Sequence, residues 1–518
     1  MSIPADTLGA DLIWWRSERG WATTVTLFWG AVQPFDDRVH LEARLFDASG
    51  SLAASWRMDL AADRPVLIDS GEPGPWRGAG DGILALYACT EGPPSEPARR
   101  HFHRLYPLVD WRGPGGEMAH LHSDQVIQRG RHLTQRITEV VIAETADEHN
   151  ALVILNGEEA QAAGALEISV RSASGDIRTV RHARAMAPFS VNRIGLREAM
   201  PDLARLCDGG PATVSARFAS RGLFTRPYVE TTGARYGAYH AGDVYEWAAL
   251  PHFVHALIGG EVDPAAVIHD ATTRTFVNLL HSHGDFEADV PVDARLYDLQ
   301  GRCVAERAGW LIASRHGLAR ADVAGLLPDP SRHFRGHIAL SFSAGSKQAV
   351  PRRLQALVEY RSAASVAHVM TWSDEWNSVV RLARRDRMAH PVAIESWCRV
   401  LQRPGVSTEV AITHAGHPGY ARAARVQLRL LDARSEVTRV DFELEAFATR
   451  FARVDELFPQ AAARLAPTGL GVLVASSASD LANMAFTRRS PGGSLAAEHF
   501  MPLLARAGDG RWVAAAGR

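Results

Sequence analysis

The segment Ala43-Arg-Leu-Phe-Asp-Ala-Ser-Gly50 recurs three more times along the chain. It returns as Ile168-Ser-Val-Arg-Ser-Ala-Ser-Gly175, as Ala294-Arg-Leu-Tyr-Asp-Leu-Gln-Gly301 and as Gln427-Leu-Arg-Leu-Leu-Asp-Ala-Arg434. Aligning Asp47, Ser172, Asp298 and Asp432 gives spacings of 125, 126 and 134 residues. Such a period is a whole domain, because solenoid units are roughly 20–50 residues long. The chain is therefore predicted to hold four copies of one domain.

Apolar and polar residues alternate in the repeated segment, as with Leu296 beside Arg295, which is typical of a half-buried strand. The closing Asp-x-x-Gly predicts a turn, because Asp can accept hydrogen bonds from its own backbone and Gly can adopt positive φ. Copy four ends in Asp432-Ala-Arg-Ser435 and lacks the glycine, so its turn is expected to differ.

Other short elements surround this strand in each copy. Copies two to four carry a short helix that stops at a proline, at 195–201, 321–328 and 454–459. Many short strands without β-α-β alternation predict an all-β fold with short helices, arranged as four tandem antiparallel β-sandwich-like repeats. We place the repeats at residues 1–124, 138–258, 270–376 and 405–518, with linkers near 125–137, 259–272 and 377–408.

The composition of the chain argues against some classes of function. The 518 residues carry a net charge of −2, with 46% hydrophobic and 22% charged residues, which argues against a dedicated nucleic-acid or membrane-surface binder. No apolar run approaches the ~20 residues that span a bilayer, and the first residues do not resemble a secretory signal. The four cysteines form no C-x-x-C pair. We expect free thiols and a cytoplasmic location.

Common catalytic motifs are missing from the sequence. There is no G-x-x-x-x-G-K, no H-E-x-x-H and no G-x-S-x-G, so P-loop, zincin and α/β-hydrolase chemistry lose their usual markers. Lys347 is the sole lysine and lies in a polar stretch, which disfavours Schiff-base chemistry.

A histidine pattern follows the fourth strand expected in each copy. Arg112-Gly-Pro-Gly-Gly-Glu-Met-Ala-His-Leu-His122 and Arg489-Ser-Pro-Gly-Gly-Ser-Leu-Ala-Ala-Glu-His499 share R-x-P-G-G-x-apolar-A-x-x-H. Copies two and three place His240 and His368 in related stretches. We predict a divalent-metal or proton-transfer role for these edge turns. Retention of the turn for folding alone is the alternative. The predicted metal ligands are His122, His240, His368 and His499, with Asp124, Asp243 and Asp374 as orienting acids.

Aromatic residues and histidines are dense between Tyr236 and His255, which is typical either of a ligand pocket or of a packed connector. Weaker H-x-H pairs occur at His281 and His283, followed by Asp285, and at His101 and His103. The predicted ligand-binding residues are Arg112, Tyr239, Trp247, Arg361 and Arg489.

Two functions stay open on this evidence. The first is a binding or structural protein that holds a small molecule or a protein partner at His- and aromatic-lined turns between repeats. The alternative is a metal-dependent enzyme whose divalent metal is held by histidines from different repeats. Neither nucleic acid nor membrane is expected as a partner.

Overall fold

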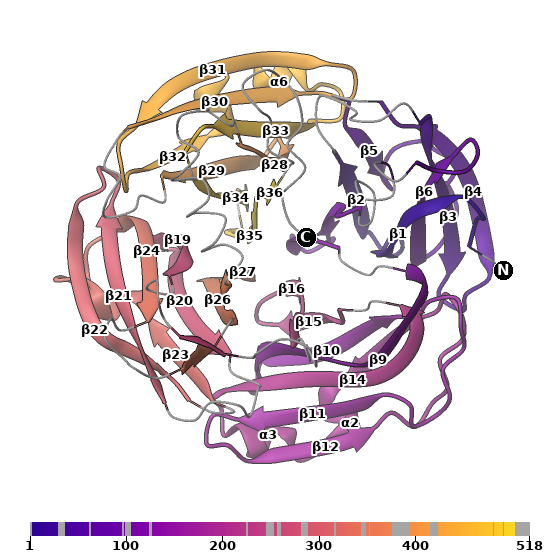
Figure 1. The fold of residues 1–518 in the computed structure, drawn as a ribbon, viewed down its shortest axis with the longest axis horizontal. Helices are drawn as coiled ribbons and strands as arrows, with labels where there is room; N and C mark the ends of the chain where they lie inside the picture. Colours follow the sequence, from indigo (N-terminus) through magenta and orange to yellow (C-terminus); the bar gives the residue numbers. More distant parts are fainter. Residues whose placement is uncertain are drawn as a thin grey trace. The chain divides into compact units, whose positions relative to one another are not determined.

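In the computed structural model, shown in Figure 1, each copy folds into two antiparallel sheets with the same strand order. The structure describes residues 3–502 except 29–36, 62–63, 96–97, 99–104, 124–126, 224–225, 245–252, 256–260, 281–288, 315–316, 343–348, 352, 375–393, 415–422, 480 and 491. The predicted fold class, four tandem β-sandwich-like repeats with short helices, is confirmed.

Copy one sets the pattern with eight strands. One sheet has the order β1-β6-β3-β4 and the other β5-β2-β7-β8. The strands are β1 Thr7–Trp15, β2 Ala22–Leu27, β3 Val39–Asp47, β4 Leu52–Asp59, β5 Val66–Asp69, β6 Gly82–Thr90, β7 Leu108–Arg112 and β8 Met118–His122.

Copy two repeats both orders, as β9-β14-β11-β12 and β13-β10-β15-β16, and adds β17 beside β9. Its strands are β9 Ile127–Ala143, β10 Glu148–Leu155, β11 Glu167–Ser172, β12 Ile177–Arg181, β13 Val191–Gly195, β14 Pro211–Leu223, β15 Tyr228–Gly233, β16 Gly237–His240 and β17 Gly242–Val244. The helices α2 Leu196–Ala199 and α3 Leu203–Cys207 follow β13.

Copy three has the orders β19-β24-β21-β22 and β23-β20-β26-β27, with a separate pair β18-β25. Its elements are β18 Phe253–His255, β19 Glu261–His269, β20 Thr273–Leu280, β21 Val290–Asp298, β22 Cys303–Ala313, β23 Leu318–Asp322, the 3-10 helix η1 Val323–Leu326, β24 Phe334–Phe342, β25 Ala349–Pro351, β26 Arg353–Ser362 and β27 Val366–Asp374.

Copy four has the orders β28-β33-β30-β31 and β32-β29-β34-β35, with β36 beside β28. Its elements are β28 Ile394–Leu401, β29 Val406–His414, β30 Ala424–Leu431, β31 Glu436–Leu444, β32 Thr449–Arg453, α5 Val454–Leu457, α6 Ala461–Arg464, β33 Leu470–Ser477, β34 Leu481–Arg489, β35 Leu495–His499 and β36 Met501–Pro502.

The chain divides into two compact units. Unit 1 is Met1–Tyr245 with Ala433–Ser435, and unit 2 is Glu246–Asp432 with Glu436–Arg518. Copies one and two therefore share unit 1, and copies three and four, apart from the turn of copy four, share unit 2. Among the described residues, no helix is long and apolar enough to cross a bilayer. All four cysteines are free thiols.

The repeated segment folds as the alternation predicts. In β3, buried and half-buried residues alternate along most of the strand, and the following β4 is largely exposed. The Asp47 carboxylate accepts the backbone N–H groups of Ser49 (2.9 Å) and Ser51 (3.0 Å), and Gly50 adopts φ +95°. Hydrogen bonds from Ser49 and Ser51 lower the pKa of Asp47. In copy one the turn is thus held by hydrogen bonds within the segment itself.

In unit 1 this turn also docks on the neighbouring sandwich. The Phe46 ring stacks on the Phe189 ring of copy two, with centroids 4.2 Å apart and planes 4° from parallel. A Cβ on Gly50 would lie 2.0 Å from the carbonyl oxygen of Pro188, so no side chain fits there.

Unit 2 repeats the arrangement with other residues. Tyr297 of copy three stacks on Phe447 of copy four at 5.1 Å and 8°. A Cβ on Gly301 would lie 2.5 Å from the carbonyl oxygen of Ala446. Phe189 and Phe447 both adopt positive φ, at +52° and +61°. The same interlock therefore joins the two sandwiches of each unit.

Two segments expected as linkers hold strands instead. Residues 125–137 include the start of β9, and residues 259–272 include β19. The third, 377–408, contains β28, while residues 377–393 lie outside the described residues. These three strands take the place of β1 in their copies, and each pairs with the strand that takes the place of β6. The linker prediction was wrong at these positions, because the first strands were read as connections.

Candidate metal site

The histidines predicted as metal ligands lie on the strands that follow the predicted turns. His122 ends β8, His240 ends β16, His499 ends β35 and His368 lies inside β27. In copy one the Gly-Pro-Gly-Gly stretch does form the preceding turn, closed by a bond from Gly113 N–H to the Glu117 carbonyl at 2.9 Å. The turn sets up a hairpin, and the hairpin's last strand carries the histidine.

Copies one, two and four place a histidine at one common position. Each histidine is opposite the same position on the seventh strand of its copy. The residue after the histidine donates its backbone N–H to the carbonyl of the residue that precedes the opposing one. The opposing pairs are Leu108–His122, Tyr228–His240 and Met484–His499. His368 is opposite Glu359, and therefore corresponds to His120, which is opposite Asp110.

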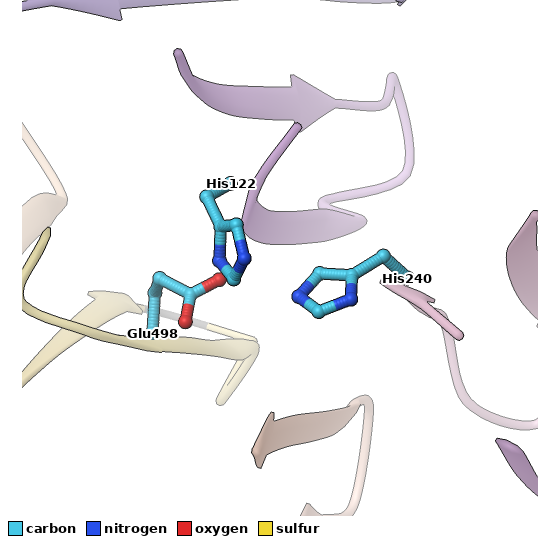
Figure 2. A group of neighbouring side chains, drawn as sticks. All are labelled: His122, His240 and Glu498. Atoms are coloured by element: carbon cyan, nitrogen blue, oxygen red, sulfur yellow. The ribbon is translucent and has the colours of Figure 1, made fainter. Parts of the chain in front are cut away.

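Two of the predicted ligands meet in unit 1. Figure 2 shows the side chains of His122 and His240 close together. Their ring centroids lie 4.2 Å apart and their planes are at 64°. A ring nitrogen of His122 lies within 4.8 Å of one of His240. Both residues are buried, at 2% and 5% exposure. They come from different sandwiches, since β8 of copy one packs against β16 of copy two.

A backbone hydrogen bond sets the tautomer of His240. Its Nδ1 lies 3.2 Å from the carbonyl oxygen of Ala241. A carbonyl oxygen can only accept, so Nδ1 carries a proton, and the neutral ring then has its lone pair at Nε2. A bond from the second ring nitrogen to a backbone carbonyl is the usual support of a metal-ligating histidine.

In unit 2, His499 and His368 have different surroundings. His499 Nδ1 donates to the carbonyl oxygen of Phe500 at 2.9 Å, as His240 Nδ1 does to that of Ala241. Its Nε2 lies 3.5 Å from Oε1 of the buried Glu498. His368 Nε2 lies 3.6 Å from Glu359 Oε2.

Glu359 is the centre of a buried charge network. Burial by itself would raise the pKa of Glu359, but His368 and the guanidinium groups of Arg320 and Arg361 lower it below its usual range. Both arginines lie 2.9 Å from Glu359 Oε1. This carboxylate is therefore ionised and neutralised inside unit 2, which is typical of a structural network.

The predicted ligand-binding arginines have protein partners or lie at strand ends. Arg112 donates to Asp69 (2.7 Å) and Thr24 (2.9 Å), and Arg361 donates to Glu359. Arg489 is half-buried at the end of β34, and Tyr239 is buried on β16. Trp247 lies outside the described residues. A ligand-binding role for these five stays a prediction.

Sequence reasoning missed His120. It lies two residues before His122 on β8, so both side chains share one face of the strand. His120 is 3% exposed, and its Nδ1 lies 4.0 Å from Asp110 Oδ1. The H-x-H spacing of His120 and His122 could have identified it. That spacing was considered only for His101 with His103 and for His281 with His283. Those four, with Asp124 and Asp285, lie outside the described residues, and for Asp243 and Asp374 the structure describes the backbone alone.

No family model matches the chain, and no curated protein does. Among solved structures, the chain is similar to one described as "Biofilm associated protein - BSP domain", with 7% identity over 97% of this chain and 98% of that chain and a TM-score of 0.13. It is also similar to "Crystal structure of tetra-tandem repeat in extending region of large adhesion protein", with 9% identity over 91% and 93% of the two chains and a TM-score of 0.09. At these TM-scores the likenesses carry no argument about function.

Proposed function

We propose that this chain is a binding protein that holds a divalent transition-metal ion between copies one and two, with His122 and His240 as ligands. The meeting of these two buried imidazoles from separate sandwiches carries the proposal. Imidazole is the commonest protein ligand of transition-metal ions, and two buried imidazoles this close together can share one ion.

The geometry supports chelation after a small adjustment. Zinc–nitrogen bonds are about 2.0–2.1 Å, so two imidazole nitrogens on a tetrahedral ion lie about 3.3 Å apart. The nitrogens of His122 and His240 are within 4.8 Å, which rotation of the side chains can close. The tautomer of His240 already presents a lone pair at Nε2.

The donor type favours one class of ion. Imidazole nitrogen suits Zn²⁺, Cu²⁺, Ni²⁺ and Co²⁺, whereas Mg²⁺ and Ca²⁺ prefer oxygen ligands. We therefore expect binding of the first group and no competition from millimolar Mg²⁺.

A metal-dependent enzyme is the second candidate. Two protein nitrogens leave coordination positions for water, as catalytic sites require. Metal-loaded protein that hydrolyses a small activated ester faster than the matched His122→Ala protein would favour this function over binding alone.

Elemental analysis and calorimetric titration of the full chain with Zn²⁺ test the proposal. We expect one tight site per chain, lost in His122→Ala and in His240→Ala. His149→Ala is the matched control, because His149 is exposed on β10 of the same unit. Circular dichroism melting shows whether each variant is folded. Wild-type protein that binds no Zn²⁺, or a His122→Ala protein that binds it unchanged, would refute the proposal.

A further inference from the structure

A buried hydrogen-bond chain lies directly beside the two histidines. Ser123 follows His122 in the sequence, and its Oγ lies 2.7 Å from Asp11 Oδ1, 2.8 Å from the Leu12 carbonyl oxygen and 3.0 Å from the Tyr228 hydroxyl. Asp11, Ser123 and Tyr228 are all 0% exposed. The Tyr228 hydroxyl can donate to Ser123 Oγ while the Ser123 hydroxyl donates to Asp11 Oδ1. Each hydroxyl then donates one hydrogen bond.

This chain connects the backbones that carry the two rings. Ser123 is the covalent neighbour of His122, while Tyr228 is directly opposite His240 in the β15–β16 ladder. Residues directly opposite in a ladder project from the same face, with Cβ atoms ~5 Å apart. The Ser123–Tyr228 bond therefore crosses between the sandwiches at the same level as the two histidines.

Copy one holds Tyr228 from a second side. The Trp111 ring meets the Tyr228 ring edge to face at 5.3 Å, and Trp111 Nε1 donates to the Trp14 carbonyl oxygen at 2.8 Å. Buried indole N–H and phenol O–H groups usually form hydrogen bonds, and those of Trp111 and Tyr228 do so here. The orientation of Tyr228 is thus set by packing and by its hydroxyl.

Unit 2 keeps the packing of this arrangement without the same hydroxyl. Tyr360 takes the place of Trp111, because its hydroxyl donates to the Ala266 carbonyl oxygen on the first strand of copy three. Its ring meets Phe486 edge to face at 5.0 Å. Met484 is opposite His499 as Tyr228 is opposite His240, so Met484 takes the place of Tyr228, and its Sδ lies 3.1 Å from the Tyr360 hydroxyl. A side chain without a hydroxyl therefore fills this position between the two sandwiches of unit 2. The hydroxyl occurs in the unit where His122 and His240 meet.

We propose that Asp11, Ser123 and Tyr228 are positioning residues that set the separation of His122 and His240 for the metal ion. This inference rests on the proposed metal site. Groups that orient metal ligands typically contribute about 10- to 100-fold to metal affinity. Loss of the crossing bond lets the two strand ends move independently, so affinity falls although both imidazoles remain.

Tyr228→Phe in the full chain tests the proposal, because it removes the hydroxyl and keeps the ring that packs on Trp111. Calorimetry with Zn²⁺ should show an affinity loss of about 10-fold. The absorption spectrum of the Co²⁺-loaded variant should also shift, because ligand geometry changes; lower stability alone would leave the spectrum of the folded protein as it was. Tyr360→Phe is the matched control and should bind Zn²⁺ like wild type.

Ser123 provides the second arm if Tyr228→Phe does not fold. Ser123→Ala should lose affinity to the same extent, and Ser123→Thr, which keeps a hydroxyl, should retain it. Wild-type protein that fails to bind Zn²⁺ would remove the metal site itself. Wild-type binding with unchanged affinity and unchanged Co²⁺ spectra in Tyr228→Phe and Ser123→Ala would refute the positioning role alone.

Discussion

The aromatic ring of Phe46 stacks on that of Phe189, with centroids 4.2 Å apart and planes 4° from parallel, and this contact joins two sandwiches in unit 1. Phe46 belongs to the segment that repeats along the chain, so the segment both forms a core strand and docks on a neighbour. The Tyr297–Phe447 stack does the same in unit 2. Odd-numbered copies provide the turn, and even-numbered copies receive it.

The docking turn can be tested with two matched glycine variants. Gly50 and Gly175 both adopt φ +95°, so alanine is strained equally at each, by about 1–2 kcal/mol. A Cβ at Gly50 meets the Pro188 oxygen, whereas nothing lies within 4 Å of one at Gly175. Gly50→Ala should therefore lower the urea unfolding midpoint more than Gly175→Ala does. Equal midpoints in the two variants would contradict the docking contact.

Arg16 links the two sandwiches of unit 1 by a buried ion pair. Its guanidinium lies 3.3 Å from the Trp21 ring centroid and 2.9 Å from Glu230 Oε1, and it also donates to the Tyr236 hydroxyl. Removing one partner of a buried pair costs about 3–5 kcal/mol, and because Glu230 keeps Arg193 2.7 Å from its Oε2, the cost here is expected at the lower end of that range.

We expect Arg16→Ala to lower the free energy of unfolding by an amount in that range, measured by chemical denaturation. Arg57→Ala is the control, since the Arg57–Glu91 pair is half exposed and such pairs contribute under about 1 kcal/mol. If both variants lose the same small amount, the Arg16 pair is not a major support of the interface.

His337 gives unit 2 a pH dependence that unit 1 lacks at the same position. It is 0% exposed, stacks on Tyr297 at 4.8 Å, and its Nδ1 lies 2.9 Å from Thr449 Oγ1 in copy four. Burial lowers its pKa to about 3. The corresponding residue in unit 1 is Ile83, which is opposite Phe46 as His337 is opposite Tyr297.

Because the folded pKa is below the unfolded value of about 6.5, the unfolded chain binds the proton first. The stability associated with neutral His337 is complete above pH 6.5 and is lost as the pH falls toward 3. Between pH 7 and pH 5 the loss in the free energy of unfolding from this group is about 2 kcal/mol. Denaturation curves at pH 7 and pH 5 should show that His337→Ile removes this difference in the free energy of unfolding. His333→Gln, at an exposed position, should leave the difference in place. A pH dependence that stays the same in His337→Ile would contradict the assignment.

The local parts of the fold could be predicted from the sequence. Alternation around Leu296 and the Asp-x-x-Gly turns depend on neighbours within a few residues, and the structure shows both. The short helices at 196–199, 323–326 and 454–457 lie within the predicted segments for the same reason. The first strands were missed because a stretch such as Ile127-Gln-Arg-Gly-Arg-His-Leu133 has no clear strand periodicity. It becomes a strand by pairing with β14, which is distant in the sequence.

The candidate site was likewise predictable only in part. The types of its ligands could be read from the sequence, and His122 and His240 were named from it. Their contact depends on how β8 packs against β16, which no local pattern contains. The hydrogen bond from Ser123 to Asp11 spans 112 residues, so the supporting chain was also beyond reach.

X-ray absorption spectroscopy of the Zn²⁺-loaded full chain tests the central claim most directly. We expect two imidazole nitrogens at about 2.0–2.1 Å from the ion, with one imidazole lost in His122→Ala and one in His240→Ala. A shell of oxygen ligands alone, or an imidazole signal that neither substitution changes, would contradict a metal site at this pair.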